Sequence, residues 1–179
     1  AVLHNQDFID SKNINIGDSI IVRKAGEIIP EVVALAAKGP QEGTFKLPEF
    51  CPACGTKAVR EADEAVLRCP NPDCPAQLLR NLIHFASRDA MDIEGLGEVA
   101  VEQLVDNGSI KKLSDIYNLT LFDLMALNAF GDKKADNLLN AIEKSKKRPL
   151  GKFIFGLGIR HIGAKTAANL DIYFKPTKS

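Results

Sequence analysis

Four cysteines in two close pairs constrain the fold of this chain more than any other feature of its sequence. Cys51 and Cys54 stand in the run Cys-Pro-Ala-Cys-Gly, and Cys69 and Cys74 follow in Cys-Pro-Asn-Pro-Asp-Cys, with fourteen residues between the pairs. Two such pairs, each bent by proline or glycine, let four thiolates converge tetrahedrally on one ion, and zinc favours this ligand set. Four protein ligands leave no open position, so the pattern predicts a structural zinc site without chemistry at the metal.

Two other uses of four cysteines fit less well. Disulfides belong to oxidising compartments, and the N-terminus has no signal-peptide pattern. Iron–sulfur clusters usually have other cysteine spacings. A segment this small buries too little apolar surface to fold alone, and zinc binding, worth roughly 10 to 16 kcal/mol in comparable peptides, would supply the difference.

The overall charge gives no general attraction to nucleic acid or anionic lipid. The 179 residues include 23 basic and 23 acidic side chains, and no apolar run approaches the roughly 18 to 20 residues that cross a bilayer. We therefore expect a soluble, cytoplasmic protein without a membrane partner. The distribution is uneven, because residues 144–170 contain seven basic residues and no Asp or Glu. Taken alone, the cluster from Lys144 to Arg148 is more often a solvated face than a binding surface.

The part before the cysteines has the pattern of strands. Residues 14–33 alternate β-branched residues and have turn signals at Gly17-Asp18 and Ala25-Gly26, which predicts consecutive short strands. Pro30 cannot donate a ladder hydrogen bond and should lie at an edge or a bulge. About fifty residues are too few to close a small barrel, so we expect part of one and a chain that begins inside a domain.

The part after Cys74 has the pattern of short helices. Pro75 suits the first turn of a helix whose apolar face comprises positions 78, 79, 82, 83 and 86. Thr120 and Asp123 match a capping box, and a further apolar face at positions 135, 138, 139 and 142 is expected to end at Pro149.

Three stretches of this helical part repeat one another. They contain Gly95-Leu96-Gly97, Phe130-Gly131 and Ile162-Gly163, and alignment of the final glycines brings further positions into register. These positions are Val101, Ala135 and Ala167 at +4, and Leu104, Leu138 and Leu170 at +7. A turn glycine permits close approach of a ligand, and the free N–H groups at a helix start suit a phosphate. This pattern indicates helix-hairpin-helix motifs, which bind the DNA backbone without sequence specificity. Glycine-capped helix corners are the alternative, and three copies in register make it less favoured.

Charge ranks the three hairpins as phosphate contacts. Acidic residues crowd the first, Lys133 and Lys134 lie between two aspartates in the second, and the third has Arg160 and Lys165 in the acid-free stretch. We expect the strongest contact at the third hairpin and partly a packing role for the first. The candidate DNA-binding residues are Arg23, Lys24, Gly95, Gly97, Gly131, Lys133, Lys134, Arg160, Gly163, Lys165 and Thr166. Solvated strand charges are an equal alternative for Arg23 and Lys24, and His161 is as consistent with packing or capping as with phosphate contact.

Several runs together carry a specific resemblance. Leu-His-Asn at residues 3–5, NIGDSIIVRKAGEIIPEVV, CPACG, RCPNPDCPAQ, MDIEGLG and FGLGIRHIG resemble, in this order, the bacterial NAD-dependent DNA ligases. The resemblance extends from Ala1 to about Leu170 and implies a multidomain α and β chain. Its expected parts are a partial OB-fold β-barrel at 1–48, a four-cysteine zinc finger at 49–76 and a truncated helix-hairpin-helix domain at 77–179.

The resemblance also implies a function. Enzymes of this family seal nicks in duplex DNA during replication and repair, using NAD and Mg²⁺, and their nucleophilic lysine lies in a Lys-x-Asp-Gly motif. This sequence contains no Asp-Gly pair. We therefore expect a monomeric part that grips nicked DNA and is inactive alone, with the zinc finger setting the geometry between barrel and hairpins. A self-standing zinc-ribbon and hairpin module of a repair or recombination factor, or a protein-interaction scaffold, stays open as an alternative.

Overall fold

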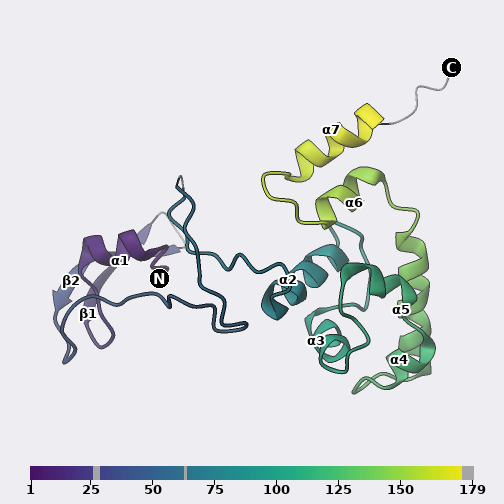
Figure 1. Cartoon of the computed structure of the whole chain (residues 1–179), viewed down its shortest axis with the longest axis horizontal. Coiled ribbons are helices and arrows are strands. Elements are labelled where there is room, and N and C mark those ends of the chain that lie inside the picture. The colour runs from purple at the N-terminus through teal and green to yellow at the C-terminus, as the bar shows by residue number, and fades with distance from the viewer. Residues whose placement is uncertain (26–28, 63, 175–179) are drawn as a thin grey trace. The chain divides into compact units, whose positions relative to one another are not determined.

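Contacts within the chain divide it into two units, Ala1–Cys74 and Pro75–Ser179. The computed structural model describes residues 1–25, 29–62 and 64–174 (Figure 1). Among these residues, no helix is both long and apolar enough to span a bilayer. The predicted domain boundaries after residues 48 and 76 stay predictions.

The first unit begins with a helix that the sequence analysis did not predict. Helix α1 spans Gln6–Lys12 and is capped at its start by Asn5, whose side chain accepts the Phe8 N–H at 2.9 Å. At its end, Asn13 adopts a left-handed conformation with φ 52°. Short polar side chains tolerate that conformation, so the helix is defined by its caps more than by apolar periodicity.

A two-stranded antiparallel sheet follows. Strands β1 (Ser19–Ala25) and β2 (Ile29–Ala37) pair with Val22 opposite Val32 and Lys24 opposite Pro30. The strands lie later than the predicted range 14–33, because Asn15 to Asp18 form a turn with Gly17 at φ 86°. Among the described residues both strands are edge strands, as expected for the strand that contains Pro30. The two register shifts, where a bulge could lie, are not at Pro30. The predicted turn at Ala25-Gly26 includes residue 26, outside the described residues.

Helix α1 holds together the other parts of the first unit. Ile9 of α1, Ile14 and Val32 form its buried apolar core. The segment after β2 is fixed by Gln6, whose side-chain amide donates to the Phe45 carbonyl and accepts the Leu47 N–H, each at 2.8 Å. These bonds satisfy backbone groups that have no strand partner, as a segment outside regular structure requires.

The second unit is helical. Its elements are α2 (Pro75–Ala86), α3 (Glu98–Asp106), the 3₁₀ helix η1 (Leu113–Asn118), α4 (Leu121–Met125), α5 (Asp132–Ser145), α6 (Leu150–Gly156) and α7 (Ala164–Phe174). Helix α2 packs against α3 and α6, α4 against α5, and α6 against α7. A single apolar core runs through the unit, and its fully buried members include Leu82, Phe85, Leu104, Ile116, Leu124 and Leu138.

Local signals predicted most of these helices. Helix α2 starts at Pro75, and the capping box is present, because Asp123 N–H donates to the Thr120 hydroxyl while the Asp123 carboxylate accepts the Thr120 N–H. The expected end of α5 at Pro149 is wrong. The helix ends at Ser145, and Pro149 is instead the N-cap of α6, because a tight turn at residues 144–148 separates the two helices.

Candidate zinc site and nucleic-acid interface

The four cysteines converge in the first unit. Their Sγ atoms all lie within 4.8 Å of one another, and Cys74 is buried. The Sγ atoms of Cys51 and Cys74 are 3.8 Å apart, and those of Cys54 and Cys69 are 3.4 Å apart. Zinc–sulfur bonds of about 2.3 Å in a tetrahedron place sulfur atoms about 3.8 Å apart. The donor set and its spacing therefore fit one zinc ion.

Short turns aim the sulfurs inward. In the first turn, Gly55 has φ 69°, and the Cys51 N–H donates to the Thr56 carbonyl while the Gly55 N–H donates to the Cys51 carbonyl, each at 2.8 Å. In the second, the Asn71 side chain accepts the Asp73 N–H and the Asn71 carbonyl accepts the Cys74 N–H. Left-handed glycine and an Asx turn are the backbone conformations that such tight returns require.

A small ladder and an ion pair fix the site to the rest of the first unit. Val59 and Arg68 exchange two backbone hydrogen bonds of 2.8 Å between the cysteine pairs. Arg60, which follows Val59 directly, donates to both carboxylate oxygens of Asp7 in α1, and this lowers the pKa of Asp7. The pair is exposed, so it orients the ladder more than it stabilises the fold.

The close approach of the four sulfur atoms favours a cation between them. Hydrogen bonding with the hydroxyl and the N–H of Thr56 lowers the pKa of Cys54 to about 6. At Cys69 the Asn71 N–H also lowers the pKa, but burial and the three neighbouring thiols outweigh it and raise the pKa to about 12. Four thiolates this close repel one another, and a bound Zn²⁺ supplies the positive charge that stabilises them together. The metal here would hold structure.

Three helix-joining turns in the second unit share one geometry. We name them the first hairpin (residues 93–97, before α3), the second hairpin (127–131, before α5) and the third hairpin (159–163, before α7). In each, the N–H of the fourth residue donates to the carbonyl of the first, at 3.2, 3.4 and 3.0 Å respectively. The third residue is left-handed in all three: Gly95 at φ 91°, Ala129 at φ 60° and His161 at φ 65°. The repeat seen in the sequence is therefore a repeat of backbone conformation.

The final glycine of each hairpin starts the next helix. Gly97, Gly131 and Gly163, here called the hairpin glycines, accept through their carbonyls the N–H of the +4 residue at 3.0 Å. Those +4 residues, Val101, Ala135 and Ala167, are fully buried, as the alignment predicted. At +7, Leu104 and Leu138 are buried, whereas Leu170 is only half-buried. The third hairpin is thus less enclosed than the other two.

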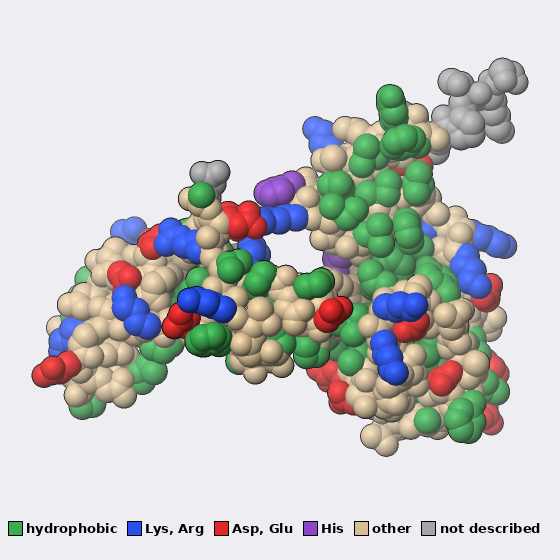
Figure 2. Space-filling model, viewed as in Figure 1, with side chains coloured by type: hydrophobic (Ala, Val, Ile, Leu, Met, Phe, Trp, Pro, Cys, Tyr) green, Lys and Arg blue, Asp and Glu red, His purple; other side chains and the backbone are tan. Residues whose placement is uncertain are grey.

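The predicted basic contacts lie at the helix starts. Lys133 and Lys134 in α5, and Lys165 and Thr166 in α7, are exposed in the first turn of their helices, and Arg160 is exposed in the third hairpin. The Lys134 ammonium turns back over the Phe130 ring at 4.0 Å from its centroid. Over the visible face in Figure 2, basic and acidic side chains are interspersed on the helical unit. Because the charges of the chain also cancel, any contact with an anion depends on individual hairpins and not on a general field.

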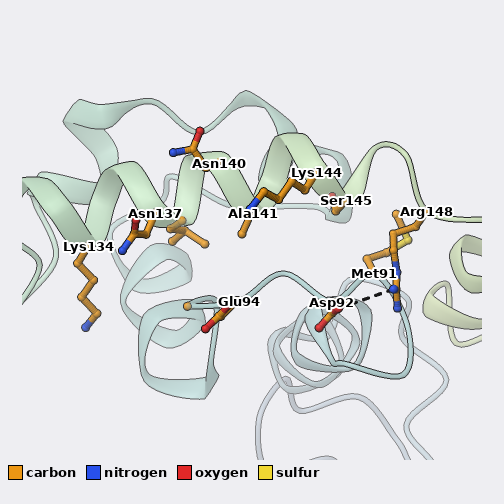
Figure 3. Close-up of a pocket in the computed structure, with 12 residues that line it drawn as sticks. Met91, Asp92, Glu94, Lys134, Asn137, Asn140, Ala141, Lys144, Ser145 and Arg148 are labelled. Carbon is orange, nitrogen blue, oxygen red and sulfur yellow. Dashed lines mark ion pairs between the residues drawn. The ribbon is translucent and has the colours of Figure 1, made fainter.

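Part of the first hairpin lines a groove together with α5, the helix that follows the second hairpin, and no residue of the third hairpin lines it. A cleft of about 730 Å³ runs between α5 and residues 91–95, and both Gly95 and Lys134 line it (Figure 3). Its walls differ in charge, with Asp92 and Glu94 on the loop side and Lys134 and Lys144 on α5. A β-carbon at Gly95 would lie 3.8 Å from Leu138, so this glycine also packs against α5.

The strand candidates are exposed in the first unit. Arg23 and Lys24 lie on β1, and Arg23 forms an ion pair of 3.2 Å with Glu31 on β2. Sequence reasoning missed Ala129 as a left-handed hairpin residue and left His161 undecided. Alignment two positions before the hairpin glycines could have found both, because Gly95 marks that position in the first hairpin.

The partial β-structure, the four-thiolate site and the helical unit define a multidomain α and β zinc-finger protein. Residues 1–43 match the family profile of the NAD-dependent DNA ligase OB-fold domain, and residues 50–76 match that of the NAD-dependent DNA ligase C4 zinc finger domain. The chain belongs to the NAD-dependent DNA ligase family, which confirms the resemblance in its sequence.

Curated relatives match nearly the whole chain. It is 53% identical over 177 residues to a DNA ligase of Thermoanaerobacter sp. (strain X514), 52% to one of Natranaerobius thermophilus and 49% to one of Bacillus cereus (strain B4264). Each similarity covers 98% of this chain but only 26 to 27% of the relative. The chain therefore corresponds to about a quarter of these ligases, and a self-standing repair module is disfavoured.

Proposed function

We propose that this chain is the DNA-gripping portion of an NAD-dependent DNA ligase that seals nicks in duplex DNA during replication and repair. In this proposal the three hairpins are helix-hairpin-helix motifs that hold backbone phosphates without sequence specificity. The partial OB fold contacts the duplex at the nick, with Arg23 and Lys24 as backbone contacts. The zinc finger sets the geometry between the partial OB fold and the hairpins. The protein acts as a monomer in the bacterial cytoplasm, without a membrane partner.

The observation that carries this proposal is the open space at the hairpin glycines. A β-carbon at Gly97, Gly131 or Gly163 would meet no atom of the described chain within 4 Å. None of the three has a positive φ, so other residues could adopt the same backbone. Neither packing nor backbone strain within the chain therefore explains glycine at these positions.

Close approach of a ligand does explain it. No side chain caps α3 or α5, whose starts follow Gly97 and Gly131. The free N–H groups and the helix dipole at such a start attract an anion, and the missing side chain lets a phosphate reach them. Phosphates of a duplex backbone recur at regular spacing, which suits a repeated motif better than a single small anion does.

Charge supports the predicted order of the three contacts. The third hairpin has Arg160 and Lys165 beside Gly163, whereas the first has Glu94 and Glu98 beside Gly97. A nearby carboxylate repels a phosphate as much as a nearby ammonium attracts it. The third hairpin should therefore bind most strongly, and the first should bind least.

The chemistry of nick sealing is assigned to other parts of the parent enzyme. A Lys-x-Asp-Gly motif, which carries the adenylated lysine in this family, is missing from this sequence. We assign NAD and Mg²⁺ to the parent enzyme and only zinc to this chain. Positioning of the two DNA ends is the contribution of the present residues, since correct placement of reactants itself lowers the barrier.

Binding of a fluorescent nicked duplex to this chain tests the proposal. Anisotropy titrations at two salt concentrations should give saturable binding that weakens with salt, because phosphate contacts release counterions. Duplexes of unrelated sequence should bind equally well. Binding that is absent, or that does not change with salt, would contradict the proposal.

A further inference from the structure

Two residues of the basic run bind the protein's own backbone. Arg148 donates from Nη2 to the Arg88 carbonyl at 3.1 Å and to the Ala90 carbonyl at 3.0 Å. Lys152 donates from Nζ to the Asp89 carbonyl at 2.8 Å. The carbonyls of three consecutive residues, 88 to 90, thus receive cationic donors from a segment about sixty residues further along the chain. We name Arg148 and Lys152 the carbonyl clamp.

The clamp joins the start of α6 to the turn that leads into the first hairpin. Arg148 lies in the connection between α5 and α6, and Lys152 lies in the first turn of α6. Figure 3 shows Arg148 at the end of the α5 groove, with its ion pair to Asp92, a distance of 3.7 Å. Asp92 is left-handed at φ 53°, and Gly95 follows three residues later. The clamp therefore acts on the backbone just before the first hairpin.

Packing behind the clamp is close. A β-carbon at Gly156 would lie 3.1 Å from the Phe85 ring and 3.3 Å from Ala90. Nearby, the His84 ring nitrogen Nε2 lies 2.9 Å from the Phe155 carbonyl. Helix α6, which leads into the third hairpin, is thus held against α2 and residues 88–90 by both apolar contact and hydrogen bonds.

We infer that Arg148 and Lys152 are positioning residues that hold the third hairpin at a fixed place relative to the first two. The inference rests on the proposed phosphate-binding role of the hairpins. Hydrogen bonds from cations to carbonyls are stronger than neutral ones, which suits them to fix a backbone segment. Hairpins that already have the correct relative positions lose little conformational entropy when DNA binds. Binding of one phosphate therefore favours binding of the other two. Arg148 and Lys152 act on DNA through this placement and do not contact it.

The distance between hairpins in the absence of DNA is the first test. Nitroxide labels on noncanonical residues at positions 133 and 165, which avoid the zinc cysteines, report this distance by pulsed electron paramagnetic resonance. Wild type and the exposed-site control Lys147→Met, which loses one positive charge next to Arg148, should give one narrow distribution. The double variant Arg148→Met/Lys152→Met should give a broad one. A narrow distribution in the double variant would overturn the inference.

Conservative replacement guards against simple misfolding. Lys152→Arg keeps a cationic donor near the Asp89 carbonyl and, with Arg148 present, should keep the narrow distribution. Far-ultraviolet circular dichroism of the double variant should match that of wild type, because the apolar core of the unit is untouched. If the double variant loses its helices, Lys152→Met alone is compared with Lys152→Arg, and equal distributions in these two would overturn the inference.

A double-mutant cycle on DNA affinity is the second test. Arg148→Met should weaken binding to a nicked duplex about tenfold, and less than about twofold when Gly163→Glu has already disabled the third hairpin. If the losses of binding free energy from Arg148→Met and Gly163→Glu were additive, Arg148 would contact phosphate directly, and this would overturn the inference. If wild type binds no nicked duplex, the proposed function fails, whereas the distance measurement without DNA still decides whether the clamp positions the hairpin.

Discussion

Replacement of the hairpin glycines by glutamate tests whether these glycines are needed for DNA binding or for folding. The three variants Gly97→Glu, Gly131→Glu and Gly163→Glu each add a side chain at an equivalent position, the residue that starts a helix. Each new β-carbon enters open space, and none of the three backbones is left-handed. Gly95→Glu is unsuitable as a comparison, because Gly95 has φ 91° and its variant would be strained before any ligand is considered.

Folding should change little in all three variants. Replacing an N-cap glycine with a poorer cap costs up to about 1 kcal/mol, and an acid at a helix start returns roughly 0.3 to 1 kcal/mol through the dipole. The net free energy of unfolding should therefore stay within about 1 kcal/mol of wild type. Thermal denaturation followed by circular dichroism measures this.

Binding should change strongly and unequally. A hydrogen bond to a charged group contributes about 1.5 to 3 kcal/mol, so loss of one phosphate site should weaken affinity about 10- to 150-fold. The loss should be largest for Gly163→Glu, which brings an acid into the acid-free stretch, and smallest for Gly97→Glu, whose surroundings are already acidic. Anisotropy titration of a nicked duplex at two salt concentrations gives the three values.

Two outcomes would refute this reasoning. Equal losses in the three variants would show that local charge does not rank the hairpins. Losses of stability far above 1 kcal/mol would show that the glycines serve the fold and not a ligand. Alanine variants at the same positions are the matched controls, because they add the β-carbon without the charge.

Three further predictions concern the metal, a helix cap and a packing contact. Protein purified without chelator should contain one zinc per chain by metal analysis, and Cys74→Ser should lose the zinc while the helical signal of α2 to α7 persists; absence of zinc from wild type would contradict the site. Asp123→Ala should cost about 1 kcal/mol at pH 7. Hydrogen bonds from the Thr120 hydroxyl and N–H hold the pKa of Asp123 below its ordinary 3.8, so this stabilisation is present above about pH 4 and is lost as the pH falls below it. Unfolding of wild type and variant at pH 7 and at about pH 3 should show the difference shrinking, and a constant difference would contradict it. Gly156→Ala should destabilise the chain by about 1 to 3 kcal/mol, because its methyl group would press on Phe85 and Ala90, whereas Gly97→Ala serves as the open-site control.

Local chemistry accounts for the parts that the sequence predicted. The cysteine spacing determines the zinc ligands, Thr120 with Asp123 starts α4, and the glycine register marks the three hairpins. Each of these signals determines structure only within a few residues along the chain. Helix α1 belongs to the same category but was missed, since QDFIDSK has too few apolar residues for helical periodicity, and only the caps Asn5 and Asn13 mark it.

Contacts between distant segments account for the rest. Nothing in the sequence near Arg148 indicates that it binds the carbonyls of Arg88 and Ala90, and the basic run favoured a surface role for it. The end of α5 was misplaced for a related reason, because Ser145 is buried against Ile142 and Tyr117, which favours a turn before Pro149. Such contacts depend on packing that periodicity and spacing do not encode.

The amide of Gln6 has a consequence for motion in the first unit. Phe45 and Leu47 belong to no helix or strand, yet their N–H groups donate to the Ile14 carbonyl and the Gln6 side chain at 2.8 Å. Their amide hydrogens should therefore exchange with solvent slowly, as in a regular element. A connection protected in this way is a stiff extension of α1 and not a hinge. Residues 45–47 should therefore move together with α1 and not independently of it.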